Sequence, residues 1–410
     1  MAHNMPRPGG QLPQPMASLC MGLHQSAEGE IQQINILQQE GVTYDYWWMD
    51  AGWYPCEEWW DGVGTWTPDP KRFPRGIKEV SDYAHANGMK LILWFEPERV
   101  YSGTWLYEHH PEWLLSLPPG APQRTWAPDS RLLNLGNPAA RQWLTDHVDR
   151  FIREQGVDLY RQDFNFDPLP YWRGNDAPDR QGMTENLHVQ GYLAYWDELR
   201  RRHPGMLIDS CAAGGGRNDL ETLRRAVPLL RSDFQGPGGP NRATGNQGHT
   251  YGLAMWIPYY GTGEYYNDGY SFRSHMCPAM GVGYDPGQSA VDWAALRRAI
   301  EEWRAVAPLY SGDYYPLTVY DLDETVWMAW QFNRPDLGEG VVQAFRRTES
   351  VYESARFKLH GLDPESRYKL QDFDKKETTD VSGRELMEAG LLVRLPHPRS
   401  SALIHYKREI

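Results

Sequence analysis

The sequence predicts an α/β fold, a (β/α)8 TIM barrel followed by a small antiparallel β domain. Between about residues 18 and 308, short apolar or aromatic runs alternate with amphipathic helical stretches, which is typical of parallel strands joined by crossover helices. After residue 311 the pattern changes to short strand-like runs separated by turns. A chain of 410 residues has room for one barrel of about 250 residues and a small additional domain.

Eight barrel strands are expected from this alternation. They lie at residues 18–22, 44–49, 90–95, 157–163, 206–210, 229–233, 255–259 and 272–277. Helices are expected between them at residues 28–39, 77–87, 139–155, 185–203, 219–225 and 291–306. Gly41, Gly88, Gly156 and Gly205 each follow a predicted helix, where a left-handed cap is expected.

The C-terminal region is expected to be made of short strands. They lie at residues 319–320, 326–332, 340–345, 367–372, 391–395 and 402–406, with turns at 333–336 and 382–383. The predicted domain organisation is an N-terminal extension at residues 1–17, a catalytic barrel at 18–311 and a C-terminal β-sandwich domain at 312–410.

The composition excludes several classes of protein. Aromatic residues make up 13% of the chain, with 18 Trp and 24 Tyr, so the sequence can bury a large core and is not disordered. The net charge of -13 without Lys/Arg clusters argues against nucleic acid or an anionic membrane as a partner. No apolar run is long enough for a membrane span, and the N-terminus lacks the apolar core of a secretory signal. These features predict a soluble cytoplasmic protein.

Four widely separated cysteines are expected to be reduced thiols: Cys20, Cys56, Cys211 and Cys277.

Acidic side chains follow four of the predicted barrel strands. They are Asp50, Glu96, Asp163 and Asp233. Residues two positions apart share one face of a strand, and the residues that share a face with these acids are Trp48, Trp94, Arg161 and Arg231. Any one strand-end acid commonly caps the next helix or pairs with arginine. Four of them at strand ends that converge on one barrel mouth instead favour a functional site.

A pair of carboxylates flanked by tryptophan is suited to glycoside hydrolysis. One carboxylate attacks the anomeric carbon while its protonated partner donates to the leaving oxygen. Arg161 is expected to keep Asp163 ionised, as a nucleophile requires. A general acid needs a raised pKa, so at Asp233 either burial and the second carboxylate outweigh Arg231, or Arg231 points to the sugar. The sequence leaves both alternatives open.

Five motifs occur in a fixed order. They are WFEPE at residues 94–98, HPEW at 110–113, RQDFN at 161–165, SCAAGGGR at 210–217 and SD at 232–233. With these motifs the chain resembles glycoside hydrolase family 36, a family of retaining α-galactosidases and α-N-acetylgalactosaminidases. The resemblance covers roughly residues 44–283 and makes Asp163 the nucleophile and Asp233 the general acid/base.

The resemblance also implies a set of sugar ligands. The predicted substrate-binding residues are Asp50, Trp48, Trp94, Arg131, Arg161, Asn165, Cys211, Gly214, Gly215 and Arg231, and neither a metal nor a cofactor is expected. The substrate would be an α-linked oligosaccharide or glycoconjugate, and the oligomeric state stays open.

The sequence departs from the family pattern at positions that bear on the choice of sugar. Ala51 follows Asp50 where a second acid is usual, Arg161 and Gln162 replace a lysine and a tryptophan, and Phe234 stands where another acid often follows. Losing one acceptor is expected to loosen or shift the sugar preference. The family's N-terminal β domain is also expected to be absent.

These features together predict a retaining exo-α-glycoside hydrolase, with α-galactosidase as the first choice. The alternatives are an α-N-acetylgalactosaminidase, a hydrolase of another α-sugar, a transglycosylase and a non-catalytic carbohydrate-binding relative.

Three further features have local interpretations. Residues 236–241 (GPGGPN) are expected to form a mobile loop at the rim of the site. Trp59, Trp60 and Trp66 lie in a polar loop and are either core residues or platforms for the leaving sugar. Residues 108–110 (EHH) are expected to be an exposed helix end rather than a metal site.

Overall fold

The computed structural model describes residues 4–20, 22–23, 25–121, 127–234, 242–266, 268–284 and 291–409. The chain forms two compact units, one of residues 3–13 and 18–231 and the other of residues 1–2, 14–17 and 232–410. The predicted domain boundaries at residues 17 and 311 stay a prediction. No helix within the described ranges is both long and apolar enough to cross a membrane. All four cysteines are free thiols, as expected.

Five neighbouring strands of the seven-stranded parallel sheet lie wholly or partly in the first unit. Their order is β8 (Leu207–Ser210), β7 (Leu159–Gln162), β3 (Lys90–Phe95), β2 (Tyr46–Met49) and β1 (Met16–Cys20). Each corresponds to one of the first five predicted strands. The register aligns Trp94 of β3 with Arg161 of β7, and Arg161 with Asp209 of β8. Neighbours in a parallel register share a face, so these three side chains are brought to the same side of the sheet.

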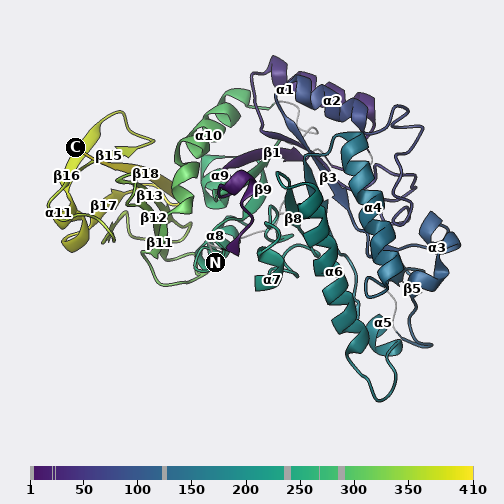
Figure 1. Cartoon of the computed structure of the whole chain (residues 1–410). Coiled ribbons are helices and arrows are strands. Elements are labelled where there is room, and N and C mark those ends of the chain that lie inside the picture. Colours follow the sequence, from purple (N-terminus) through teal and green to yellow (C-terminus); the bar gives the residue numbers. More distant parts are fainter. Residues whose placement is uncertain are drawn as a thin grey trace. The chain divides into compact units, whose positions relative to one another are not determined.

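Helices connect these strands; those at residues 27–39, 78–86, 138–155, 183–202 and 220–223 correspond to predicted helices, whereas those at 105–109 and 169–174 were not predicted. They are α1 (Ala27–Gln39), α2 (Lys78–Ala86), α3 (Trp105–His109), α4 (Pro138–Gln155), α5 (Leu169–Gly174), α6 (Met183–Arg202) and α7 (Leu220–Leu223). The long helices α4 and α6 run side by side, as do α1 and α2 (Figure 1). Local signals explain the ends of α4: the Asn137 side chain caps its N-terminus, Pro138 occupies its first turn, and Gly156 ends it with a φ of 71°. A small sheet in the order β4 (Arg99–Val100), β6 (Arg131–Leu133) and β5 (Leu114–Leu115) was not predicted.

The predicted strand at residues 229–233 is absent. The chain makes only an isolated parallel bridge there, between Val227 and Asp209. Pro228 follows Val227 directly, and because proline has no N–H to donate, it interrupts the pairing that Val227 begins. Alternation along this strand therefore does not place Arg231 and Asp233 on a common face, contrary to the prediction.

The seventh and eighth predicted strands are also shifted. Helix α8 (Arg242–Leu253) lies in the second unit, and strand β9 lies at Gly261–Tyr265 rather than at residues 255–259. The strand predicted at residues 272–277 is replaced in large part by helix α9 (Gly269–His275), because the Asp268 side chain accepts the N–H of Ser271 and caps a helix start. The strand that follows is β10 (Ala279–Gly283), which pairs in parallel with β9. Helix α10 (Trp293–Val306) agrees with its prediction.

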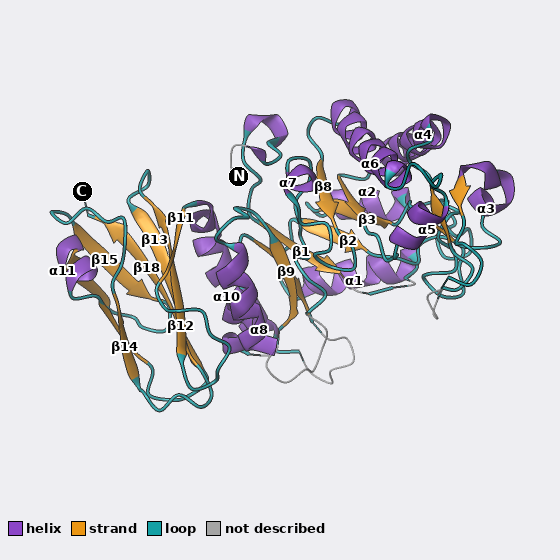
Figure 2. Ribbon diagram, turned by 90° about the horizontal axis from the view of Figure 1, so that it is seen from below, coloured by secondary structure: helices purple, strands orange, loops and turns teal. Residues whose placement is uncertain are grey.

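The C-terminal part is an antiparallel sheet, as predicted. Its order is β11 (Asp313–Pro316), β12 (Trp327–Arg334), β13 (Glu339–Arg346), β18 (Ser400–Arg408), β15 (Arg367–Asp372) and β16 (Thr378–Ser382), shown together with α11 (Gly383–Glu388) in Figure 2. Strands β14 (Ser354–Phe357) and β17 (Leu391–Arg394) form a separate pair. A buried core that includes Trp327, Phe357 and Tyr406 joins these strands. The predicted strand at residues 319–320 is wrong, since both residues are exposed and lie outside any strand.

Candidate active site

Asp163 lies just beyond the carboxyl end of β7 and is 8% exposed. Its Oδ1 accepts the backbone N–H groups of Phe164 at 2.7 Å and Ala213 at 3.3 Å. Its Oδ2 accepts Asn165 Nδ2 at 2.8 Å and Trp94 Nε1 at 3.2 Å. Four donors from three segments of the chain therefore hold this carboxylate in one orientation.

The surroundings of Asp163 favour its ionised form. Burial acts to raise its pKa, but the charge of Arg161 and hydrogen bonds from the Cys211 thiol, the Asn165 side chain and the Phe164 N–H outweigh burial. The pKa of Asp163 consequently lies below its ordinary value. This geometry offers an anionic oxygen that is pre-oriented and shielded from bulk water.

Arg161 is surrounded by carboxylates and is 3% exposed. Its Nη1 forms an ion pair with Asp209 Oδ2, and its Nε lies 3.7 Å from Asp50 Oδ2. Its guanidinium carbon lies 4.7 Å from the centre of the Trp48 ring. One cation therefore links Asp50 and Asp209 while its charge also acts on Asp163.

Asp50 retains some access to solvent. Its side chain is 19% exposed, whereas that of Asp209 is fully buried. Trp48 Nε1 donates to Asp50 Oδ2 at 3.1 Å, and the Ala51 N–H donates to Asp50 Oδ1 at 2.9 Å. Burial raises the pKa of Asp50 more than the charge of Arg161 lowers it. Of these two carboxylates, Asp50 is therefore the one placed to accept a ligand hydroxyl.

Asp209 was not among the predicted site residues, although it forms an ion pair with Arg161. Asp209 Oδ1 accepts the Leu229 N–H at 2.8 Å, and burial raises the pKa of its carboxyl. A signal was present in the sequence, because Asp209 shares a strand face with Cys211. What the sequence did not contain was the register that sets Asp209 beside Arg161.

The segment after β8 is shaped by close approaches. Ala213 and Gly214 have φ values of 42° and 80°, which turn the Ala213 N–H toward Asp163. A Cβ on Gly215 would lie 2.7 Å from the Arg231 carbonyl oxygen, so a side chain does not fit there without a backbone shift. The glycines at 214 and 215 thus allow the chain to pass beside Asp163 and Arg231.

A buried ion pair between Arg217 and Glu98 holds the segment after β8 in place. Arg217 makes two hydrogen bonds to Glu98, at 2.6 and 2.8 Å, and Glu98 also contacts His188 Nε2 at 2.7 Å and Gln162 Nε2 at 2.9 Å. Burial acts to raise the pKa of Glu98, but the charge of Arg217 and the hydrogen bonds from His188 and Arg217 lower it to about 2. Glu98 and Arg217 were quoted within motifs, but their pairing was not foreseen.

Three predicted site residues have other described environments. Arg131 lies on β6 with its guanidinium 4.2 Å from the centre of the Tyr107 ring. Arg231 is 2% exposed, and its carbonyl oxygen accepts Asn218 Nδ2 at 3.5 Å. Asp233 is exposed and belongs to the second compact unit. The loop at residues 236–241 lies outside the described residues.

The tryptophans after β2 have different environments. Trp66 is 1% exposed and its ring packs against those of Trp53, Tyr54 and Phe95, so it is a core residue and not a sugar platform. Trp59 is half-buried, with its ring centre 6.0 Å from that of Trp94. Trp60 is also half-buried, and its ring meets Tyr101 at 5.3 Å. The platform role of Trp59 and Trp60 stays a prediction.

The end of α3 is exposed as predicted. Glu108 and His109 both face solvent. Across the described ranges, no group of three or more His, Cys, Asp or Glu side chains has the arrangement of a metal site.

Comparison with protein families identifies the class of this chain. Residues 28–237 match the family model described as Melibiase, and residues 327–406 match the glycosyl hydrolase family 36 C-terminal domain. The first match alone covers more than half of the chain. The chain therefore belongs to glycoside hydrolase family 36, in agreement with the resemblance inferred from its motifs.

Two curated relatives indicate how much of such a protein is present. Alpha-galactosidase 1 of Pediococcus pentosaceus is 26% identical over 356 residues, which cover 83% of this chain and 47% of the relative. Alpha-galactosidase C of Emericella nidulans is 29% identical over 387 residues, covering 88% of this chain and 48% of the relative. The chain spans about half the length of the curated relatives it matches.

Solved structures confirm the fold. The α-galactosidase of Lactobacillus brevis matches with a TM-score of 0.83 at 20% identity, over 97% of this chain and 55% of that chain. AgaA of Geobacillus stearothermophilus, solved in complex with stachyose, matches with a TM-score of 0.82 at 20% identity, over 97% of this chain and 56% of that chain. The fold class is thus the predicted TIM barrel followed by an antiparallel β domain.

Proposed function

We propose that this chain hydrolyses terminal α-galactosides with retention of configuration, with Asp163 as the nucleophile. The observation that carries the proposal is the carboxylate of Asp163, held by four hydrogen bonds beside Arg161 with a lowered pKa. An ionised, oriented carboxylate of this kind is suited to attack on an anomeric carbon. The relatives named α-galactosidase support galactose as the sugar.

The proposed reaction has two steps. One oxygen of Asp163 attacks the anomeric carbon, forming a β-linked glycosyl ester, while Asp233 gives its proton to the departing glycosidic oxygen. Asp233 then removes a proton from water, which attacks the same carbon and releases α-galactose and the Asp163 carboxylate. The role of Asp233 rests on the SD motif at residues 232–233, and Asp233 is exposed.

Asp50 and the aromatic residues beside it are proposed to select the sugar. The partly accessible carboxylate of Asp50 would accept a sugar hydroxyl, and the Trp94 ring borders the Asp163 carboxylate. AgaA was solved with stachyose and with raffinose, which supports α-linked oligosaccharides as the substrate class.

A second candidate activity is α-N-acetylgalactosaminidase. It is favoured by the small side chain of Ala51, which removes one carboxylate beside Asp50, and by the small residues Ala212 and Ala213. A panel of aryl α-glycosides compared by kcat/KM separates the two activities. If only the N-acetylgalactosaminide is cleaved, the protein is an α-N-acetylgalactosaminidase and not an α-galactosidase. If a galactoside binds but no product is released, the protein is a non-catalytic relative.

The nucleophile is tested with Asp163→Ala and an activated aryl α-galactoside. The variant should lose at least about 1,000-fold in kcat, and added azide should restore turnover and yield β-galactosyl azide, because azide replaces the missing carboxylate. Proton NMR of the parent reaction should show α-galactose as the first product. Asp197→Asn, which alters an exposed carboxylate paired with Arg225, is the control and should keep parental turnover. A first-formed β anomer, or parental turnover by Asp163→Ala, would refute the assignment.

A further inference from the structure

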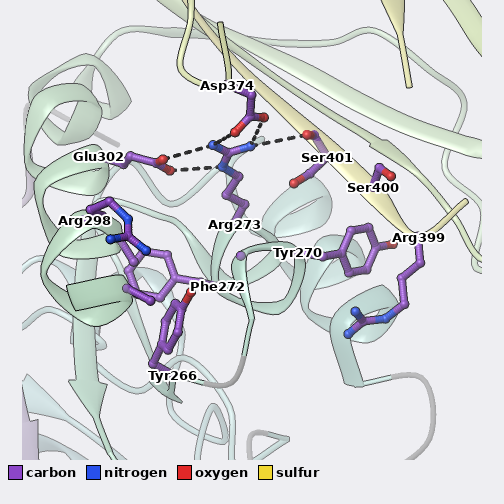
Figure 3. A pocket seen from close by; sticks show the side chains of 13 residues that line it. Tyr266, Tyr270, Phe272, Arg273, Arg298, Glu302, Asp374, Arg399, Ser400 and Ser401 are labelled. Atoms are coloured by element: carbon purple, nitrogen blue, oxygen red, sulfur yellow. Dashed lines mark hydrogen bonds and ion pairs between the residues drawn. The ribbon is translucent and has the colours of Figure 1, made fainter. Parts of the chain in front are cut away.

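A pocket of about 260 Å³ lies in the second unit. All of its lining residues fall between residues 266 and 401. Its walls come from α9, α10, the start of β18 and the turns after β9 and β15 (Figure 3). None of its lining residues belongs to the five motifs of the sequence or to the cluster around Asp163. This pocket is therefore a separate feature, with no role in the proposed reaction.

Arg273 forms a rigid floor for the pocket. Its guanidinium makes two hydrogen bonds to Glu302, both at 3.1 Å, and two to Asp374, at 2.7 and 2.9 Å. A further bond reaches the Ser401 carbonyl oxygen at 3.3 Å. Figure 3 shows Arg273 between these partners, which come from α10, the turn after β15 and β18. Arg273 is only 6% exposed, and its guanidinium is held by five hydrogen bonds. The position of this side chain is therefore fixed before any ligand binds.

Aromatic rings form two sides of the pocket. Tyr266 lies with its ring centre 6.0 Å from that of Phe272, and the Arg399 guanidinium lies 4.8 Å from the centre of the Tyr270 ring. Phe272 and Tyr270 are buried, whereas Tyr266 is half-buried. Tyr266 is therefore the ring whose face is available to a ligand.

The charges around the pocket balance. Its three arginines are Arg273, Arg298 and Arg399. Arg273 is paired with Glu302 and Asp374, and Arg399 lies 3.0 Å from Asp268. Three cations and three carboxylates leave no excess charge to attract a strongly anionic ligand. A neutral ligand rich in hydroxyl groups suits such a lining better, because guanidinium and carboxylate groups both bond hydroxyls.

Two hydrogen-bonding groups at the pocket are available to a ligand. Within the part of the chain that the structure describes, neither the Tyr266 hydroxyl nor the Arg298 guanidinium has a hydrogen bond or an ion pair with another residue. Ser400 Oγ donates to the His397 carbonyl at 2.6 Å and keeps lone pairs that can accept. An open aromatic face with adjacent donors is the combination that binds the apolar face and the hydroxyls of a sugar.

We propose that this pocket is a non-catalytic binding site for one neutral sugar residue of an oligosaccharide. The sugar ring packs on Tyr266 and its hydroxyls bond to Arg298 and Ser400. The volume lies just below the usual range of about 300 to 1,000 Å³ for drug-sized ligands, so the rest of the oligosaccharide extends into solvent. The site would hold an oligosaccharide on the protein independently of its cleavage.

The test is calorimetry with raffinose as the probe, on a chain carrying Asp163→Asn to prevent turnover. The variant Tyr266→Ala/Arg298→Ala should lose one class of binding site or bind it at least 10-fold more weakly. The control Tyr352→Ala/Arg394→Ala changes an exposed tyrosine and an exposed arginine outside the pocket and should bind as the parent does. Each double variant is also made in the parent chain, without Asp163→Asn. Its kcat on an aryl α-galactoside should equal that of the parent.

Two results would overturn the proposal. One is unchanged raffinose stoichiometry and affinity in Tyr266→Ala/Arg298→Ala, with its melting temperature equal to that of the control. The other is binding of inorganic phosphate, but not raffinose, that depends on Arg298, since this would identify an anion site. Loss of the proposed galactosidase activity would be a separate failure, because raffinose binding that depends on Tyr266 does not require turnover. If the double variant does not fold, Arg298→Ala alone tests the same contact, because Arg298 is exposed on a helix.

Discussion

The buried pair of Glu98 and Arg217 leads to a prediction about both stability and pH. Glu98→Gln removes the charge that compensates Arg217 and replaces an acceptor oxygen by an amide donor. A carboxyl whose pKa falls from its ordinary 4.5 to about 2 on folding contributes about 3 kcal/mol at neutral pH, at about 1.4 kcal/mol per pH unit. Removing one member of a buried pair costs about 3 to 5 kcal/mol, so both routes indicate the same size of effect.

The assay is thermal unfolding of the parent and of Glu98→Gln at several pH values. At pH 7 the variant should melt about 6 to 12 °C lower, at about 2 to 4 °C per kcal/mol for a unit of this size. Because the folded pKa of Glu98 is depressed, its stabilisation is present above pH 4.5 and is lost as the pH falls toward 2. The gap between parent and variant should therefore narrow in acid.

Two further variants make this prediction specific. Glu98→Gln combined with Arg217→Met should recover part of the lost stability, because no unpaired charge is then buried. Glu221→Gln, which alters an exposed glutamate paired with arginines on its own helix turn, should melt as the parent does. A melting temperature of Glu98→Gln within about 1 °C of the parent at pH 7 would refute the reasoning.

Two other predictions concern buried carboxylates. Asp209→Asn should lower kcat/KM on an aryl α-galactoside by about 10- to 100-fold, because Arg161 loses the partner that orients it. Parental kinetics would show that Asp209 does not position Arg161. Burial raises the pKa of Glu30 to about 8, so folding stability should fall by about 5 kcal/mol as the pH rises from 4.5 to 8. Glu30→Gln, which can still accept the indole N–H, should melt higher than the parent at pH 9 and no higher at pH 4, as differential scanning calorimetry would reveal.

Local patterns determined much of the fold. The first five barrel strands and most of the helices between them were predicted correctly, because apolar runs and a helical period are visible within a few residues. The same alternation predicted that Trp48 shares a strand face with Asp50 and Arg161 with Asp163, and that the strand-end acids converge on one barrel mouth. In the structure Trp48 donates a hydrogen bond to Asp50 and Trp94 donates one to Asp163, while the Arg161 guanidinium lies over the Trp48 ring.

Prediction failed where a short apolar run had more than one possible structure. Residues 272–277 were predicted to be a strand and lie mostly in α9, because the cap at Asp268 outweighs the strand-like composition. The run after Val227 is apolar too, but Pro228 has no N–H to donate, and the pairing stops after one bridge. Run length and composition could not separate these outcomes.

The sequence alone determined the family, the alternation of strands and helices, and the candidate carboxylate at Asp163. Only the tertiary structure decided which side chains complete that site. Asp209 meets Arg161 across 48 residues, and Glu98 meets Arg217 across 119. Such contacts depend on strand register and on how distant segments pack, and neither is encoded in the periodicity of a single segment. Periodicity tells which way a side chain faces, whereas register and packing decide what it faces.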